Sequence, residues 1–398
     1  MNVFITGANF GNKGAQSMLF TTVSEIRRHF PDAKIFFGHG STPCLRGKFS
    51  FDEVYWTLGS LKISGGKIAA GKFPAWCSAK KTVETMKNSD LIIDVSGFAL
   101  GAKWGVKKAF AYLNSINIAR ALGVPMILFP QSFGSFDFAE SQKKLDAAIK
   151  NVMPYPEKIF ARERDGFIPL RDKYGLENIT LHPDIVLSGK KLNPGDIYKV
   201  VPEISVPKIL PESCVGVVPN LRSFDKGNRW QTLQIFYELI NFLLAEKKRV
   251  YLFRHSIEDI VPCTWLKNLF PDDERVILWK NDFSCFEYDE VCRQFDFLIV
   301  GRFHGIVHAY KNNVPCLLLG WAVKYRELAQ LMYQSQYIFD ITDPKIDVRN
   351  IFAAIRDMEN NLKLNKEILR QRLEQVQMRS TCFDSAIKIL RGAEGKSL

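Results

Sequence analysis

Short apolar runs alternate with helical patterns along the first half of the chain. Runs as long as buried strands lie at residues 3–6, 34–37, 91–95, 126–129, 158–161 and 179–181. Helical periodicity lies between them, from about residue 16 onward and around residues 107–122. This alternation is typical of βαβ units on a mostly parallel sheet. It predicts a first α/β domain over residues 1–187.

The same alternation returns after a change in composition. Residues 188–211 are rich in proline, contain Gly189 and Gly195 and show no helical periodicity, so we expect a linker there. Further apolar runs lie at residues 215–218, 249–253, 276–278, 297–300 and 316–319, with a helical pattern at 230–246. We expect a second α/β domain over residues 212–347.

A long helical pattern closes the chain. It runs from residue 348 to about residue 391, with a candidate break near residue 381. We expect a C-terminal helical segment over residues 348–398 that could cross back to the first domain. The whole pattern predicts two Rossmann-like domains facing a cleft. Ligands of such folds bind at the carboxyl ends of the strands, so candidate chemistry is expected directly after each apolar run.

Charge and composition narrow the class of protein. Lys and Arg outnumber Asp and Glu by 12 among 398 residues, which favours anionic partners. The basic residues are scattered, without a polybasic block, so we expect no nucleic acid partner. The eight cysteines form no C-x-x-C pair, the N-terminus does not resemble a signal peptide, and no apolar stretch approaches the roughly 20 residues of a membrane span. We expect a cytoplasmic location, with membrane contact at the surface alone.

The turn after residue 300 carries the strongest candidate chemistry. Gly301 ends an apolar run, and Arg302, Phe303 and His304 stand where a helix is expected to begin. The first N–H groups of a helix are unpaired and attract anions. Arginine adds a fixed cation, and histidine adds a proton donor or acceptor near neutral pH. We interpret this turn as an anion site with an acid–base residue, His304.

A glycine-rich loop follows the first expected strand, at residues 7–15. Its spacing matches neither of the two common nucleotide fingerprints. A simple strand-to-helix turn would need fewer glycines and no pair of asparagines. We therefore interpret Gly11 as permitting close approach of a ligand, and Asn9 and Asn12 as hydrogen-bonding sugar hydroxyls.

Other strand ends carry polar residues whose role the pattern leaves open. Ser96 and Gln131 follow expected strands and could line a sugar-sized pocket, while a structural turn fits either of them equally. Arg222, close to Asn220, could reach a phosphate or a carboxylate, or could simply be exposed. Arg162 begins a charged turn, for which a surface ion-pair cluster is the plainer interpretation.

The spacing of two histidines raises the question of a metal. His304 and His308 stand at i and i+4, which could place both on one helix face. The segment lacks the glutamate of an H-E-x-x-H motif, and no carboxylate cluster stands near it in the sequence. We expect no metal and interpret His308 as a packed helix residue.

Six stretches of the chain, in order, carry a family resemblance. They are GANFGNKGAQSML, DLIIDVSGFALG, ILFPQSFGSF, IFARERDGF with the later HPDIVL, VGVVPNLR and FLIVGRFHGIVHAYKNNVPCLLLG. Together they resemble the polysaccharide pyruvyl transferase family. The resemblance covers the chain from residue 2 to about residue 333. The chain departs from that family at Glu163, where aspartate is usual, and in SGFALG, which lacks the family's glycine pair. The resemblance implies a fold like the GT-B glycosyltransferases.

The resemblance also implies a reaction. Pyruvate would pass from phosphoenolpyruvate to a sugar, most often as a cyclic ketal bridging two hydroxyls, in capsule, exopolysaccharide or cell-wall glycan biosynthesis. His304 would protonate the methylene carbon, and phosphate would leave. No cofactor is expected beyond this donor substrate. The residues expected to bind phosphoenolpyruvate are Arg302, Phe303, Arg222, Arg162 and Asn220.

The acceptor is expected on the N-terminal domain by analogy with GT-B enzymes. The residues assigned to it are Asn9, Asn12, Gly11, Gln131 and Ser96. In many such pathways the acceptor is a lipid-linked oligosaccharide, and the net positive charge suits an anionic inner leaflet. Two alternatives stay open: a GT-B nucleotide-sugar glycosyltransferase, in which Glu327 would hold a ribose, and a non-catalytic carbohydrate-binding protein.

Overall fold

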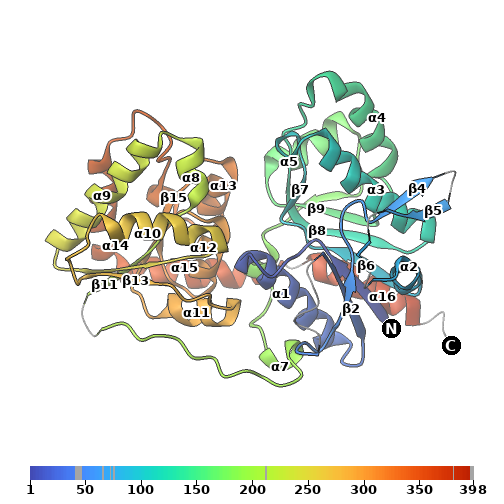
Figure 1. The fold of residues 1–398 in the computed structure, drawn as a ribbon, viewed down its shortest axis with the longest axis horizontal. Coiled ribbons are helices and arrows are strands. Elements are labelled where there is room, and N and C mark those ends of the chain that lie inside the picture. The colour runs from blue at the N-terminus through green and yellow to red at the C-terminus, as the bar shows by residue number, and fades with distance from the viewer. Residues whose placement is uncertain are drawn as a thin grey trace. The chain divides into compact units, whose positions relative to one another are not determined.

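The computed structural model describes residues 1–40, 47–64, 67–71, 73–74, 77–210, 213–379 and 381–394. Packing divides the chain into two compact units, each built on its own sheet (Figure 1). Unit 1 comprises Met1–Phe10, Ala15–Pro202 and Arg379–Leu398, and unit 2 comprises Gly11–Gly14 and Glu203–Met378. The short segment Gly11–Gly14 is thus grouped with unit 2 by its contacts, although its chain neighbours belong to unit 1.

Unit 1 is built around a parallel sheet. In spatial order its strands are β10 (Ile179–Leu181), β9 (Lys158–Ala161), β8 (Met126–Phe133), β6 (Leu91–Asp94), β1 (Asn2–Thr6), β2 (Lys34–His39) and β3 (Asp52–Tyr55), and β7 (Phe98–Leu100) pairs with β8 outside this row. These pairings are all parallel. An antiparallel pair, β4 (Leu61–Ser64) with β5 (Lys67–Ala70), forms a separate small sheet.

Helices cover both faces of this sheet, as the continuous apolar strands require. One face packs on α3 (Val106–Leu122) and α4 (Gln142–Val152), and Leu128 of β8 belongs to that core. Phe129 points to the opposite face, because side chains alternate along a strand, and there it meets Phe383 of α16 (Thr381–Glu394) edge to face. The other helical segments are α1 (Lys13–His29), α2 (Ala79–Lys87), α5 (Arg164–Ile168), α6 (Ile185–Ser188), α7 (Pro194–Ile197), η1 (Ala102–Trp104), η2 (Ala139–Ser141) and η3 (Pro169–Lys173).

Unit 2 repeats this plan with a second parallel sheet. In spatial order its strands are β13 (Val276–Trp279), β12 (Arg249–Phe253), β11 (Cys214–Val218), β14 (Leu298–Val300), β15 (Cys316–Leu319) and β16 (Ile338–Phe339). One face packs on α9 (Arg229–Ala245), α10 (Ile260–Asn268) and α14 (Val348–Asn360), with Leu252 of β12 in that core. On the opposite face Phe253 contacts Tyr288 of α11 (Cys285–Arg293). The other helical segments are α8 (Leu221–Lys226), α12 (Phe303–Lys311), α13 (Val323–Leu331), α15 (Leu362–Gln377), η4 (Ile257–Asp259) and η5 (Ser335–Tyr337).

Both sheets reverse the order of their strands beside the first strand of the unit. β1 lies between β2 and β6, and β11 lies between β12 and β14. This reversal defines the doubly wound α/β topology, and its switch point is where ligands of such sheets bind. The prediction of two Rossmann-like domains with parallel sheets, followed by a C-terminal helical segment, is confirmed.

Three elements differ in detail from the expectation. Helix α1 begins at Lys13, earlier than the periodicity indicated. Strand β8 continues through Pro130, although proline has no N–H to donate to a neighbouring strand. The pairing of β8 with β9 is irregular between Leu128 and Gln131, so no regular ladder hydrogen bond is lost at this position. The C-terminal pattern has a second break, at Asn361, between α14 and α15.

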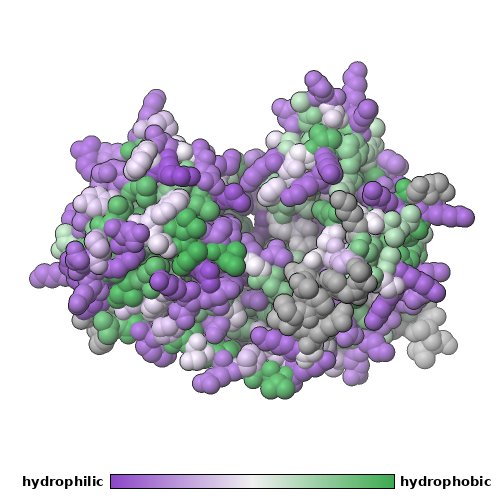
Figure 2. Space-filling view, in the orientation of Figure 1, coloured by the Kyte–Doolittle hydropathy of each residue, from purple (hydrophilic) through white to green (hydrophobic). Residues whose placement is uncertain are grey.

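Polar residues cover most of the surface visible in Figure 2, and hydrophobic residues form smaller areas on it. The large exposed apolar side chains include Trp230 and Met378, and exposed apolar residues are ordinary for a protein surface. In the part of the chain that the structure describes, no helix is both long enough and apolar enough to cross a membrane.

Helices α11 and α12 are held together by the buried carboxylate of Asp289. It lies 2.6 Å from His308 Nδ1, and it accepts hydrogen bonds from Lys311 Nζ at 2.9 Å and Asn312 Nδ2 at 2.8 Å. Burial alone raises the pKa of Asp289, but the Lys311 ammonium and the His308 ring outweigh it and hold the pKa well below its usual value. His308 is fully buried in this contact, which fixes α12 and therefore the residues at its start.

Replacing Asp289 with Asn should lower the free energy of unfolding by about 3–5 kcal/mol, because it leaves the largely buried Lys311 charge without a carboxylate. The pKa of Asp289 is depressed in the folded state. The contribution of Asp289 to the free energy of unfolding is therefore complete above the pKa that this residue has in the unfolded chain. It is lost as the pH falls toward the pKa of Asp289 in the folded protein. Urea unfolding at pH 7 measures the effect, with the exposed Glu290→Gln on the same helix as control. Equal stability of the two variants would contradict the conclusion that Asp289 holds α11 and α12 together.

Candidate functional site

The ends of β11 and β14 are tied together by Asn220, the residue before α8. Its Nδ2 donates to the Gly301 carbonyl at 2.9 Å, and its Oδ1 accepts the N–H of Arg222 at 3.0 Å. The Tyr325 hydroxyl donates to the same Gly301 carbonyl at 3.1 Å. Asn220 is buried, so these bonds fix the turn that leads from β14 into α12. That turn carries Arg302.

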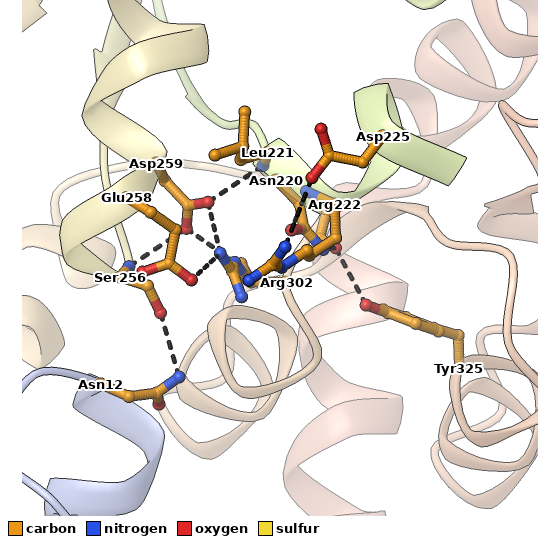
Figure 3. A network of polar contacts seen from close by, with 11 residues as sticks. Asn12, Asn220, Leu221, Arg222, Asp225, Ser256, Glu258, Asp259, Arg302 and Tyr325 are labelled. Atoms are coloured by element: carbon orange, nitrogen blue, oxygen red, sulfur yellow. Dashed lines mark hydrogen bonds and ion pairs between the residues drawn. The ribbon is translucent and has the colours of Figure 1, made fainter. Parts of the chain in front are cut away.

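Arg302 is held by two acidic residues of η4 (Figure 3). Its Nε donates to Asp259 Oδ2 at 2.7 Å, and its Nη2 lies 2.6 Å from Asp259 Oδ1 and 2.7 Å from Glu258 Oε1. Asp259 also accepts the N–H groups of Leu221 and Ser256. The Asp259 side chain is 0% exposed, whereas that of Glu258 is 35% exposed. Asp259 is therefore fixed by the fold, and Glu258 is the partner that can leave.

The ionisation of this trio follows from burial and from the two ion pairs. Burial disfavours the Arg302 charge, but Asp259 and Glu258 outweigh it and raise the pKa of the guanidinium. Partial burial raises the pKa of Glu258, but a backbone hydrogen bond and the Arg302 charge lower it more, so the net shift is downward. Burial raises the pKa of the deeper Asp259 in spite of Arg302. Arg302 and Glu258 are thus both charged at neutral pH.

His304 lies in the first turn of α12, next to Phe303, whose ring it meets edge to face. Its ring is nearly parallel to that of His255, with 6.5 Å between the ring centroids. Gly14 packs against it so closely that a Cβ at position 14 would lie 2.1 Å from His304 Cγ. Burial, aided by positive neighbours, holds the pKa of His255 well below its usual value, so that ring stays neutral.

Two further basic residues, Lys13 and Arg254, lie in unit 2 and share one carboxylate. Lys13 Nζ is 2.7 Å from Asp282 Oδ1, and Arg254 Nη2 is 3.5 Å from the same oxygen. The Lys13 side chain is 6% exposed, which is rare for a lysine. Asn12 donates to Ser256 Oγ at 3.0 Å, close to Arg302 (Figure 3). The structure thus groups Asn12, assigned from sequence to the acceptor, with unit 2.

We call Lys13, Arg222, Arg254 and Arg302 the cationic site. Each of these cations has a carboxylate partner, and the fourth pair is a loose contact of 3.4 Å between Arg222 and Asp225. The side chains of Asp225 and Asp282 are 38% and 52% exposed. A bound anion would compete with these carboxylates for the cations. The partly exposed Glu258, Asp225 and Asp282 are the ones that can be displaced.

Asp259 and Lys13 belong to the site but were not assigned to it from the sequence, which carried a partial signal for Asp259 alone. Ser256 to Asp259 reads S-x-x-D, a capping-box pattern, and the structure shows both of its hydrogen bonds. That pattern predicts the turn but does not indicate that Asp259 holds Arg302, 43 residues away. Lys13 carried no signal, because a lysine in this glycine spacing matches neither nucleotide fingerprint.

In unit 1 the structure brings Ser96 and Gln131 together around Asp94. The Ser96 N–H and hydroxyl donate to Asp94 Oδ1 at 2.9 and 2.6 Å. The Tyr112 hydroxyl donates to Asp94 Oδ2 at 2.7 Å and accepts from Gln131 Nε2 at 3.0 Å. Burial raises the pKa of Asp94, although these hydrogen bonds oppose the shift. Asn9 is exposed and is not part of this group, and Gly11 belongs to unit 2.

Arg162 lies in unit 1 and is buried among polar groups. Its Nη1 donates to Asp184 Oδ2 at 2.7 Å, and its Nη2 donates to the Gly97 carbonyl at 2.6 Å and to Ser132 Oγ at 2.7 Å. The side chain is 3% exposed. The interpretation as a surface ion-pair cluster is therefore wrong, because the network is internal and connects the loops after β6 and β9 with β8.

The two histidines of α12 are not arranged as a pair of metal ligands. His308 Nδ1 is engaged with Asp289, and His304 is half-buried in the first turn of the helix. Among the residues described, no group of three or more His, Cys, Asp or Glu side chains is placed to hold a metal ion.

Comparison with known proteins identifies a family and a fold. The family model described as polysaccharide pyruvyl transferase matches residues 12–322. Comparison with the curated proteins finds no match.

Solved structures resemble the whole chain at low identity. UDP-GlcNAc 2-epimerase from Neisseria meningitidis bound to UDP-GlcNAc has a TM-score of 0.57 at 9% identity, covering 98% of this chain and 100% of its own. UDP-glucose: anthocyanidin 3-O-glucosyltransferase in complex with UDP has a TM-score of 0.57 at 11% identity, and the match covers 98% of this chain and 99% of that structure's chain. UDP-GlcNAc 2-epimerase from Methanocaldococcus jannaschii has a TM-score of 0.51 at 11% identity, and the match covers 93% of this chain and 99% of that structure's chain. These similarities show the fold alone, and they confirm the predicted GT-B-like class.

Replacing Glu258 with Gln should strengthen the binding of inorganic phosphate by about 2- to 5-fold, because it removes a partly exposed competitor for Arg302 while Asp259 still holds the guanidinium. Titration calorimetry at low ionic strength measures the dissociation constant. The matched control is Glu246→Gln, which breaks a surface pair with Arg356 elsewhere in unit 2. Weaker phosphate binding by Glu258→Gln than by the control variant would show that Glu258 does not compete with the ligand.

Proposed function

This chain belongs to the polysaccharide pyruvyl transferase family, and we propose that it transfers pyruvate from phosphoenolpyruvate to a sugar of a polysaccharide precursor. The product is a cyclic ketal that bridges two sugar hydroxyls, and inorganic phosphate is released. The family match makes the protein a pyruvyltransferase. The donor, the acceptor, the ketal and a role in capsule, exopolysaccharide or cell-wall glycan biosynthesis are the proposal.

The single observation that carries the proposal is the cationic site beside His304. Phosphoenolpyruvate has a phosphate and a carboxylate on one small molecule, and two separate groups of cations suit it. Arg302 with Arg222 forms one group, and Lys13 with Arg254 forms the other. The two acidic groups of the substrate would take the places of Glu258 and Asp282. Phe303 and Asn220 keep the turn in position.

Arg162 has a different part in the proposal. Two of its guanidinium nitrogens are bound to groups inside unit 1, and its side chain is 3% exposed. Releasing them for a ligand would leave the buried Asp184 carboxylate without its cation, which is costly. We therefore assign Arg162 to supporting the strand ends of unit 1 rather than to direct contact with phosphoenolpyruvate.

His304 is the proposed general acid. As imidazolium it gives a proton to the methylene carbon of phosphoenolpyruvate, and the central carbon becomes an oxocarbenium-like electrophile. One sugar hydroxyl adds to that carbon, phosphate leaves, and the second hydroxyl closes the ketal. Of the two hydroxyl protons released, one restores the His304 imidazolium and the other leaves with phosphate. General acid catalysis of this kind contributes typically about 10²- to 10⁴-fold.

The direct test follows phosphate release from phosphoenolpyruvate in the presence of lipid-linked sugars and identifies the product by mass spectrometry. The expected product is a pyruvate ketal, and an enolpyruvyl ether would correct the product while keeping the donor. Transfer from a nucleotide sugar without phosphoenolpyruvate consumption would favour the glycosyltransferase alternative, in which Glu327 of α13 holds the ribose. Absence of turnover with sugar binding intact would favour a carbohydrate-binding protein.

Replacing His304 with Gln or Ala should lower kcat by at least about 100-fold, because the proton donor is lost. Binding of phosphoenolpyruvate should persist, since the cations that hold it remain. Calorimetry of phosphoenolpyruvate binding and a phosphate-release assay separate the two effects. His29→Ala, exposed at the end of α1, is the matched control. A fully active His304 variant would sink the assignment.

The acceptor is proposed to be a lipid-linked oligosaccharide on the inner membrane leaflet. The formal net charge of +12 favours peripheral contact with anionic lipids. Sedimentation with vesicles containing phosphatidylglycerol should show binding that weakens as salt is added, because the attraction is screened. Vesicles of phosphatidylcholine alone are the control. Binding that is equal on both vesicles, or insensitive to salt, would count against the membrane proposal.

A further inference from the structure

A cavity of about 210 Å³ lies at the switch point of the sheet in unit 1. Its walls come from the carboxyl ends of β1, β2 and β6, from the residues after β3 and from α3. The lining residues are Thr6, Gly7, Ala8, Gly38, His39, Gly40, Trp56, Thr57, Leu58, Asp94, Ser96, Tyr112 and Ser115. Of the residues assigned to the acceptor from sequence, the cavity includes Ser96.

The charge of this lining excludes an anion as the preferred ligand. The lining contains no Lys or Arg. Its histidine, His39, is buried, and burial lowers its pKa to about 4, so it is neutral at physiological pH. Asp94 lies in the wall and brings the only ionisable carboxyl group among the lining residues described. A phosphate, a nucleotide or a carboxylate would therefore lose its hydration without gaining a compensating cation from the lining residues.

The polar groups of the lining suit hydroxyl groups instead. Thr6 is 8% exposed, and neither its hydroxyl nor that of Thr57 has a hydrogen-bond partner among the residues described. The Ser96 hydroxyl donates to Asp94 and can still accept a bond from a ligand. Thr6 is buried and Thr57 is half-buried, and their hydroxyls, which can both donate and accept, suit a ligand rich in donors and acceptors.

The apolar part of the lining and the volume narrow the ligand further. Trp56 and Leu58 offer apolar surface to the C–H groups of a ring. The cavity is smaller than the roughly 300–1,000 Å³ of sites for drug-sized ligands. One sugar ring fits such a space better than an oligosaccharide.

We propose that this cavity binds one uncharged sugar ring, the ring of the acceptor that receives the pyruvyl group. The inference rests on the proposed function, which supplies the reason for a sugar. Thr6 and Thr57 hydrogen-bond its hydroxyls, Asp94 with Ser96 accepts from them, and Trp56 covers its apolar face. The cationic site of unit 2 is left to the anionic donor.

The test measures sugar binding and turnover separately, on the full chain. Methyl glycosides of glucose, galactose, mannose and N-acetylglucosamine are titrated in saturation-transfer NMR and calorimetry, without phosphoenolpyruvate. Thr6→Val and Thr57→Val keep the shape and remove one hydroxyl each. Each should weaken binding of the preferred glycoside by about 2- to 10-fold, and the double variant by roughly tenfold or more. Thr180→Val on β10, at the opposite edge of the same sheet, is the matched control.

In the phosphate-release assay the same variants should raise KM for the acceptor and leave KM for phosphoenolpyruvate unchanged. Unchanged melting temperatures would exclude a folding defect. Parent-like glycoside binding by the folded double variant would overturn the inference, and so would binding of glucuronate or UDP in the cavity in preference to uncharged glycosides. If the variants lose glycoside binding while the parent never releases phosphate, the cavity remains a sugar site and the proposed function fails.

Discussion

The candidate site in unit 2 depends on how the backbone groups at the ends of β11 and β14 are satisfied. The Gly301 carbonyl accepts two side-chain hydrogen bonds, and Asp259 accepts the N–H groups of Leu221 and Ser256. An unpaired backbone group in this buried place would cost about as much as a lost hydrogen bond. The same Asp259 carboxylate also holds Arg302, so one set of contacts fixes both the turn and the cation. The position of His304 at the start of α12 follows from it.

The two units share a topology but differ in the chemistry at their switch points. In unit 2 the switch point is surrounded by cations whose charges are balanced by carboxylates, three of them partly exposed. In unit 1 the lining of the cavity has no cation, and His39 is neutral. Because the fold is common to both, the side chains placed on it decide what binds. A balanced cationic site suits an anion that displaces a carboxylate, and an uncharged hydroxyl-lined cavity suits a sugar.

Apolar periodicity predicted the strands well and the side-chain contacts poorly. Strands β9, β12 and β15 have the predicted bounds, because a largely buried strand is a nearly continuous apolar run. Strand β10 also has the predicted bounds, although two of its three residues are exposed. Strand β8 was predicted too short, since Pro130 reads as a terminator and the irregular pairing that accommodates it depends on the neighbouring strand. Arg162 reads as a surface charge because its sequence neighbours are charged, while its actual partners lie 22 to 65 residues away.

The sequence by itself determined two parallel sheets, the places where their strands end and the residues that stand there, including Arg302 and His304. Local periodicity can do this because burial along one element repeats with the geometry of that element. The tertiary structure alone decided that Asp259 and Glu258 hold Arg302, that Lys13 meets Asp282 across 269 residues of sequence, and that four strand ends enclose a cavity without a cation. Ion pairs and cavities depend on which elements become neighbours, and no local pattern in a single sequence records that.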